Sequence, residues 1–107
     1  MQLSVKQRIY LESALSAFTE GRYEQLKAKK SILEKIDFTT EEIQELDFKS
    51  VPNGSSVVYN WNLEKEIPRQ VDFLELETTL IKEILVKLNE EARLSEQLFD
   101  IYELFVM

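Results

Sequence analysis

The chain has 107 residues, of which 44% are hydrophobic, and its 13 basic and 20 acidic side chains give a formal net charge of −7. It contains no cysteine and no histidine, which excludes disulfides, the usual zinc sites, cysteine nucleophiles and histidine-based proton transfer. Charged side chains interrupt every apolar run near the N-terminus, so we expect no signal peptide, no membrane span and a cytoplasmic protein. The length predicts a single domain over residues 1–107.

The charge is distributed unevenly along the chain. Residues 1–36 contain seven basic and four acidic side chains, whereas residues 37–107 contain six basic and sixteen acidic ones. The resulting net charges of +3 and −10 argue against general nucleic-acid binding, which needs a broad basic surface. They permit head-to-tail self-association or binding to a basic partner, although ordinary solvated helix faces would produce the same pattern.

Three helices are predicted in the first half of the chain. Ser4 is suited to cap a first helix, and Gly21 is expected to end it. A second helix is predicted over residues 22–36. Thr39 followed by Glu42 forms a capping box, which predicts the start of a short third helix.

The segment SVPNGSSVVYNWN, residues 50–62, interrupts this helical pattern. The pair Asn53-Gly54 favours a tight turn, and the flanking β-branched and aromatic residues predict a β-hairpin. On its second strand, Val57, Tyr59 and Trp61 alternate onto one face. We expect that face to cover the helical core, with Tyr59 or Trp61 as a partly exposed contact residue in the alternative interpretation.

The last third of the chain is predicted to be helical again. Pro68 excludes a regular helix over residues 63–71, which leaves an extended connector or a third, edge strand. Asp72 is expected to cap a long helix over residues 73–90, whose apolar face contains one acidic residue, Glu77. Ser95 is expected to cap a final helix over residues 96–106. That helix is apolar on nearly every side, which is typical of deep burial or of an interface.

The sequence offers no catalytic pattern. Its many carboxylates lack the glycine-rich or aromatic surroundings of a sugar cleft, and the two glycines do not form a phosphate-binding loop. We therefore expect a protein that is not an enzyme and that has neither a cofactor nor a metal site.

The order of helices followed by a hairpin is also that of a winged-helix DNA-binding protein. In that fold the third helix would enter the major groove, but here its acidic residues would face phosphates. The same residues suggest instead a surface that imitates DNA, although two of them simply complement the positive end of a helix. These residues are Glu41, Glu42, Glu45 and Asp47.

Two stretches of the chain carry a resemblance to known proteins: SVKQRI at residues 4–9 and KLNEEARLSEQLFDIYELF at residues 87–105. Trp61-Asn62 in the predicted hairpin fits the same pattern. These features resemble small acidic proteins of phage and prophage genomes that have no assigned function. The chain departs from the pattern at Ala92, where the resemblance implies a glycine before Leu94. The resemblance implies a phage context and no particular chemistry.

These observations predict an α+β domain that is mostly helical, with about five helices, one β-hairpin and an optional third short strand. The hypothesis for its function is a small non-enzymatic protein-interaction protein, with self-association through the last helix left open. An acidic inhibitor of a nucleic-acid-binding protein is the alternative, and a winged-helix-like DNA-binding regulator is less favoured. The expected partner-binding residues are aromatic: Tyr59, Trp61, Phe99, Tyr102 and Phe105.

Overall fold

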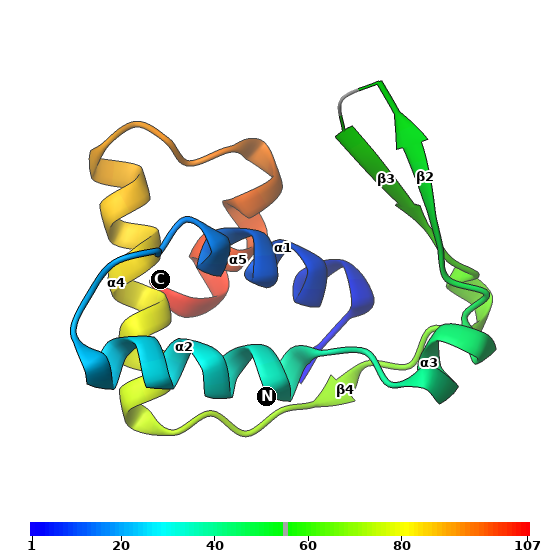
Figure 1. Cartoon of the computed structure of the whole chain (residues 1–107), viewed down its shortest axis with the longest axis horizontal. Coiled ribbons are helices and arrows are strands. Elements are labelled where there is room, and N and C mark those ends of the chain that lie inside the picture. Colours follow the sequence, from blue (N-terminus) through cyan, green and yellow to red (C-terminus); the bar gives the residue numbers. More distant parts are fainter. Residues whose placement is uncertain (55) are drawn as a thin grey trace.

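The computed structural model describes residues 1–54 and 56–107 and places helices and two small antiparallel sheets in one chain (Figure 1). The predicted α+β class is confirmed, because the described residues contain five α-helices and one β-hairpin. In chain order the elements are β1 (Gln2–Leu3), α1 (Val5–Ser16), α2 (Tyr23–Ile36), α3 (Thr40–Glu45), β2 (Lys49–Asn53), β3 (Ser56–Asn60), the 3₁₀ turn η1 (Leu63–Lys65), β4 (Arg69–Gln70), α4 (Glu75–Glu90), the 3₁₀ turn η2 (Glu96–Leu98) and α5 (Phe99–Phe105).

The core lies between α1, α2, α4 and α5, which pack together on the left of Figure 1. Each helix contributes apolar side chains spaced three or four residues apart, so that one stripe of the helix faces inward. The fully buried members include Leu11, Leu15, Ile32, Leu85 and Ile101. Helix α4 buries Leu80, Ile81, Ile84, Leu85 and Leu88 against the other helices, whereas Leu74 and Leu76 at its start are exposed.

Two of the predicted helix starts are confirmed in atomic detail. Ser4 Oγ accepts a hydrogen bond from the Gln7 amide at 3.1 Å, and Gln7 Oε1 accepts one from the Ser4 amide at 2.9 Å. Thr39 and Glu42 form the same reciprocal pair at the start of α3. Such a box satisfies two amides that the helix itself leaves unpaired.

Of the other two predicted caps, Asp72 is wrong, whereas Ser95 is confirmed in its position before Glu96 but not as a side-chain cap. Helix α4 begins at Glu75 and its N-cap is Leu74, whose amide donates to the buried carboxylate of Glu77 at 2.8 Å, so Asp72 lies before the cap. The Ser95 side chain makes no capping hydrogen bond to the described residues that follow it. The segment after it starts as the 3₁₀ turn η2, and α5 begins only at Phe99.

The prediction that Gly21 ends the first helix is wrong, because α1 ends at Ser16 with the right-handed residue Ala17 as its C-cap. Helices α3 and α4 end differently, each at a left-handed residue. Asp47 after α3 has φ 51° and Ala92 after α4 has φ 55°. In each case the next amide reaches back into the helix, from Phe48 to the Ile43 carbonyl at 3.0 Å and from Arg93 to the Leu88 carbonyl at 2.8 Å. This is the Schellman arrangement. Ala92, which stands where the resemblance implies glycine, therefore occupies a conformation that favours glycine.

The hairpin forms as predicted, with the turn one residue later. Asn53 pairs with Ser56, so Asn53 is a strand residue and the turn begins at Gly54, which has φ 66°. The expectation that the hairpin covers the helical core is wrong. Its described side chains are all exposed, and the hairpin projects away from the helices in Figure 1. The side chain of Val57 lies outside the described part of the structure.

Residues 63–71 contain a short strand, but it does not extend the hairpin. After η1 the chain forms β4, which pairs antiparallel with β1 through Gln2–Gln70 and Leu3–Arg69. Glu66 Oε1 also accepts a hydrogen bond of 2.6 Å from the amide of Val5, the first residue of α1. This connector therefore fixes the start of α1. Within the described ranges, none of the helices has both the length and the apolar character needed to cross a membrane.

Candidate functional site: a groove between helix α1 and strand β3

The open side of the hairpin is a groove between α1 and β3, which we call the α1–β3 groove. It consists of two adjoining hollows of about 430 and 220 Å³ that share Ile9, Tyr10, Tyr59 and Gln97. Its apolar lining comes from both sides: Ile9 and Tyr10 from α1, Phe38 and Phe48 from the loops, and Val58, Tyr59 and Trp61 from the hairpin. Lys6, Glu12, Ser13, Ser16 and Gln97 provide the polar lining.

An aromatic cluster forms the floor of the groove and attaches the hairpin to the helices. The Phe48 ring lies 5.1 Å from Phe38, 5.6 Å from Tyr59 and 5.9 Å from Trp61, centroid to centroid, and is nearly parallel to the Trp61 ring. The Asn62 amide donates to the Leu46 carbonyl at 2.7 Å. The Trp61 Nε1–H is buried without a hydrogen-bond acceptor among the described residues. The base of the hairpin is thus anchored, while its strands remain exposed.

Beneath this cluster lies a buried arginine that the sequence interpretation missed. Arg8 is only 1% exposed, and its guanidinium lies 4.0 Å above the Phe38 ring. It donates to the carbonyls of Ile36 and Asp37 at 3.0 and 2.7 Å, and to both carboxylate oxygens of Glu42 at 2.7 and 3.2 Å. One side chain therefore joins α1 to the end of α2 and to α3. The signal in the sequence is that Arg8 lies on the apolar stripe of α1, three residues from Val5 and from Leu11.

Glu42 is held by a second arginine as well. Arg69 Nη1 lies 3.4 Å from Glu42 Oε1 and also donates to the Asp37 carbonyl. The hydrogen bond from Arg8 is the largest influence on this carboxyl and holds the pKa of Glu42 below its usual value, against the opposing effect of partial burial. Glu42 is consequently an ionised structural residue.

This arrangement reduces the acidic surface that the sequence suggested. Glu41 and Glu45 are exposed on α3, but Glu42 is neutralised by two arginines. Asp47 lies 3.5 Å from the Lys49 ammonium and occupies a left-handed position after α3. The four residues therefore do not form a continuous, uncompensated acidic face.

The five predicted aromatic contact residues separate into two groups. Tyr59, which is 44% exposed, and the partly buried Trp61 both line the α1–β3 groove. The other three belong to α5. Phe99 is 60% exposed and Tyr102 is half-buried, whereas Phe105 is 8% exposed and packs edge-on against Phe73 at 5.9 Å. Phe105 is thus a core residue of its own chain.

A second buried charge joins α2 to α4, away from the groove. Glu77 is 2% exposed, and its Oε1 lies 2.5 Å from Lys35 Nζ, which also donates to the Asp72 carbonyl at 3.0 Å. Burial raises the pKa of Glu77, but the hydrogen bonds from Lys35 and from the Leu74 amide outweigh it, so the pKa lies below its usual value. The ion pair explains the acidic residue on the apolar face of α4.

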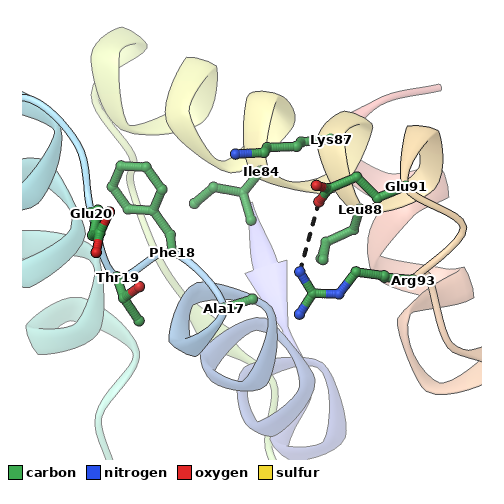
Figure 2. Close-up of a pocket in the computed structure, with 9 residues that line it drawn as sticks. All are labelled: Ala17, Phe18, Thr19, Glu20, Ile84, Lys87, Leu88, Glu91 and Arg93. Atoms are coloured by element: carbon green, nitrogen blue, oxygen red, sulfur yellow. Dashed lines mark ion pairs between the residues drawn. The ribbon is translucent and has the colours of Figure 1, made fainter.

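A smaller hollow of about 180 Å³ lies between the ends of α1 and α4 (Figure 2). Phe18, Ile84 and Leu88 provide its apolar surface, and Figure 2 shows the exposed ion pair between Arg93 and Glu91, 3.7 Å apart, on one side. Its charged lining residues are all exposed to solvent. We assign no role to this hollow.

In the part of the chain that the structure describes, no group of three histidine, cysteine, aspartate or glutamate side chains is placed to hold a metal ion. No protein-family model, curated protein or solved structure matches the chain. The α1–β3 groove is therefore the feature from which we infer a function.

Proposed function

We propose that this chain is a non-enzymatic protein-interaction protein that binds an extended segment of a partner in the α1–β3 groove. The observation that carries the proposal is the position of the groove, because it combines an aromatic lining with the adjacent strand β3, which pairs only with β2 among the described residues. Apolar clefts beside an exposed strand are a recurrent way of binding extended peptides. Tyrosine and tryptophan, both present here, are among the residues that dominate interface energies.

The two other hypotheses have less support. Self-association through the last helix would have to use Phe99 and Leu104, which are 60% and 39% exposed, because Ile101 and Phe105 of the same helix are buried in the core of their own chain. The nucleic-acid mimic requires a continuous acidic surface, and the pairing of Glu42 with two arginines interrupts it. The resemblance of three motifs to small acidic phage and prophage proteins is the reason for proposing a phage context for the interaction.

Site-specific photo-crosslinking tests the proposal. Gln97 lines both hollows of the groove and is exposed, so the photoreactive residue p-benzoylphenylalanine can replace it without disturbing the core. Tyr23, exposed at the start of α2, is the matched control position. In cells of the natural host, we expect covalent adducts from position 97 and none from position 23. Absence of adducts at position 97, or equal yields at both positions, would overturn the proposal.

A further inference from the structure

The outer edge of β3 presents free backbone groups toward the α1–β3 groove. Asn53 and Ser56 pair with two residues between them, and the pair that closes such a hairpin exchanges both of its hydrogen bonds. Hydrogen-bonded and non-hydrogen-bonded pairs alternate from there. The amide and carbonyl of Val57 and of Tyr59 therefore point outward. Figure 1 shows β3 as the strand nearer to α1, and within the described residues the sheet has only the strands β2 and β3.

The two edges of the hairpin are not equivalent. On β2 the outward positions are Pro52 and Ser50, and Pro52 has no amide hydrogen to offer. Lys49 adds a charge to the same strand. Proline and lysine are the residues that commonly protect an edge strand from pairing. By contrast, β3 has the uncharged sequence SVVYN and neither protecting residue.

We propose that the partner segment in the groove is β3 of a second copy of this chain, so that two hairpins form one four-stranded antiparallel sheet in the order β2, β3, β3, β2. This inference rests on the proposed function and names the occupant of the groove. Pairing that overlaps all five residues of β3 places Val58 opposite Val58 of the second copy. In that register Val57 of each copy lies opposite Tyr59 of the other, so all the outward groups of both strands are satisfied.

The arrangement is favoured by the marginal stability of the hairpin alone. A two-stranded sheet that projects into water is at the limit of stability, and additional strands stabilise it. Antiparallel pairing also directs each hairpin tip toward the base of the other hairpin, beside Tyr59 and Trp61 in the groove. Since Pro52 closes the opposite edge, the sheet ends at β2 on both sides and the assembly stops at a symmetric dimer.

Charge variants at Val58 test the dimer, with Val51 as the matched control. Val58 and Val51 are cross-strand neighbours, are 41% and 44% exposed, and differ in that only Val58 lies on the β3 edge. In the proposed dimer, Val58→Lys places two ammonium groups on side chains whose Cβ atoms lie about 5 Å apart. We expect sedimentation equilibrium at 0.15 M salt, a concentration at which surface charges are partly screened, to show a dimer for the wild type and for Val51→Lys. Val58→Lys is expected to weaken dimerisation about tenfold or more, given like charges at this separation.

A mixture of two oppositely charged variants distinguishes an effect on the dimer interface from an effect on folding. Val58→Glu alone is expected to be monomeric, whereas an equimolar mixture with Val58→Lys is expected to restore a dimer that contains one chain of each kind. A wild type that stays monomeric throughout the concentration range, or a dimer that is indifferent to every change at Val58, would overturn the inference. If the wild type is monomeric but position 97 still yields adducts with another protein, the proposed function stands and only the second copy is excluded as occupant.

Discussion

Arg8 and Glu42, separated by 34 residues in the chain, form a two-pronged ion pair with Nη1–Oε2 and Nη2–Oε1 distances of 2.7 and 3.2 Å. The same guanidinium donates hydrogen bonds to the carbonyls of Ile36 and Asp37 at the end of α2, and Glu42 caps the start of α3. The pair therefore fixes α3 and the loop residue Phe38 relative to α1. Arg8 contacts Phe38, Phe38 contacts Phe48, and Phe48 packs against Tyr59 and Trp61 at the base of the hairpin. We therefore expect the width of the α1–β3 groove to depend on Arg8.

Replacing Arg8 with methionine is predicted to be strongly destabilising. The change leaves the Ile36 carbonyl without its donor and leaves Glu42 and the Asp37 carbonyl with Arg69 alone. Removal of one partner from a buried pair costs about 3 kcal/mol or more. Arg8→Lys is expected to recover little, because a single ammonium cannot reproduce a planar fork of donors. Urea unfolding measures both. Arg22→Met, at an exposed arginine, is the control and should change the free energy of unfolding by less than about 0.5 kcal/mol.

The stability of the protein is predicted to fall on acidification. The pKa values of Glu42 and Glu77 are both depressed in the folded chain, so their ionised forms contribute stability that is fully present above the usual pKa near 4.5. This contribution is lost as the pH falls through the lower folded pKa. Unfolding titrations between pH 6 and about pH 3 should therefore show a steeper loss for the wild type than for Glu42→Gln/Glu77→Gln. Gln44→Ala, at an exposed position on α3 that carries no titratable group, should leave the wild-type slope unchanged; an equal flattening in this control would contradict the assignment.

The sequence predicted those features whose causes are local. The capping boxes of Ser4 and Thr39 involve residues three positions apart, and hairpin formation follows from the turn and strand residues themselves. The role of Arg8 could not be predicted in full, because its partners at Ile36, Asp37 and Glu42 lie 28 or more residues away. Only its place on an apolar stripe was visible, as was that of Glu77.

The position of the hairpin was beyond sequence reasoning for a different reason. Alternation along a strand shows which side chains share a face, but it does not show whether another element covers that face. Here the aromatic face lines an open groove, whereas alternation alone favoured burial. Position 92, where the resemblance implies a glycine, has a left-handed conformation that glycine adopts more readily than alanine.

Ala92→Gly is predicted to stabilise the protein. A left-handed backbone costs an alanine about 1 kcal/mol, which glycine avoids, although glycine also gains entropy in the unfolded chain. The expected net gain is about 0.5 kcal/mol, measured by thermal or urea unfolding. Ala17→Gly is the matched control, because Ala17 ends α1 in the right-handed region with φ −75°. It should destabilise the protein by about 0.5–1 kcal/mol.

The Lys35–Glu77 pair is predicted to show strong energetic coupling. Lys35→Met alone leaves a buried carboxylate without its ammonium and should cost about 3 kcal/mol, discounted somewhat because the Lys35 side chain is 30% exposed. Replacement of both residues, as in Lys35→Met/Glu77→Leu, should restore most of that stability, since an apolar pair fits the surrounding core. A double-mutant cycle from urea unfolding gives the coupling free energy. Purely additive effects of the two substitutions would show that the ion pair contributes nothing as a unit.

Phe48→Ala is predicted to release the hairpin from the groove floor. The substitution removes the ring that contacts Phe38, Tyr59 and Trp61, and the loss of these aromatic contacts should cost about 2 kcal/mol. Trp61 is the only tryptophan of the chain, so its fluorescence reports on this site alone. We expect a shift of its emission to longer wavelength as water reaches the indole, whereas Phe99→Ala, at an exposed ring on α5, should leave the spectrum unchanged. An unchanged spectrum in Phe48→Ala would mean that Trp61 is held by contacts other than the aromatic cluster.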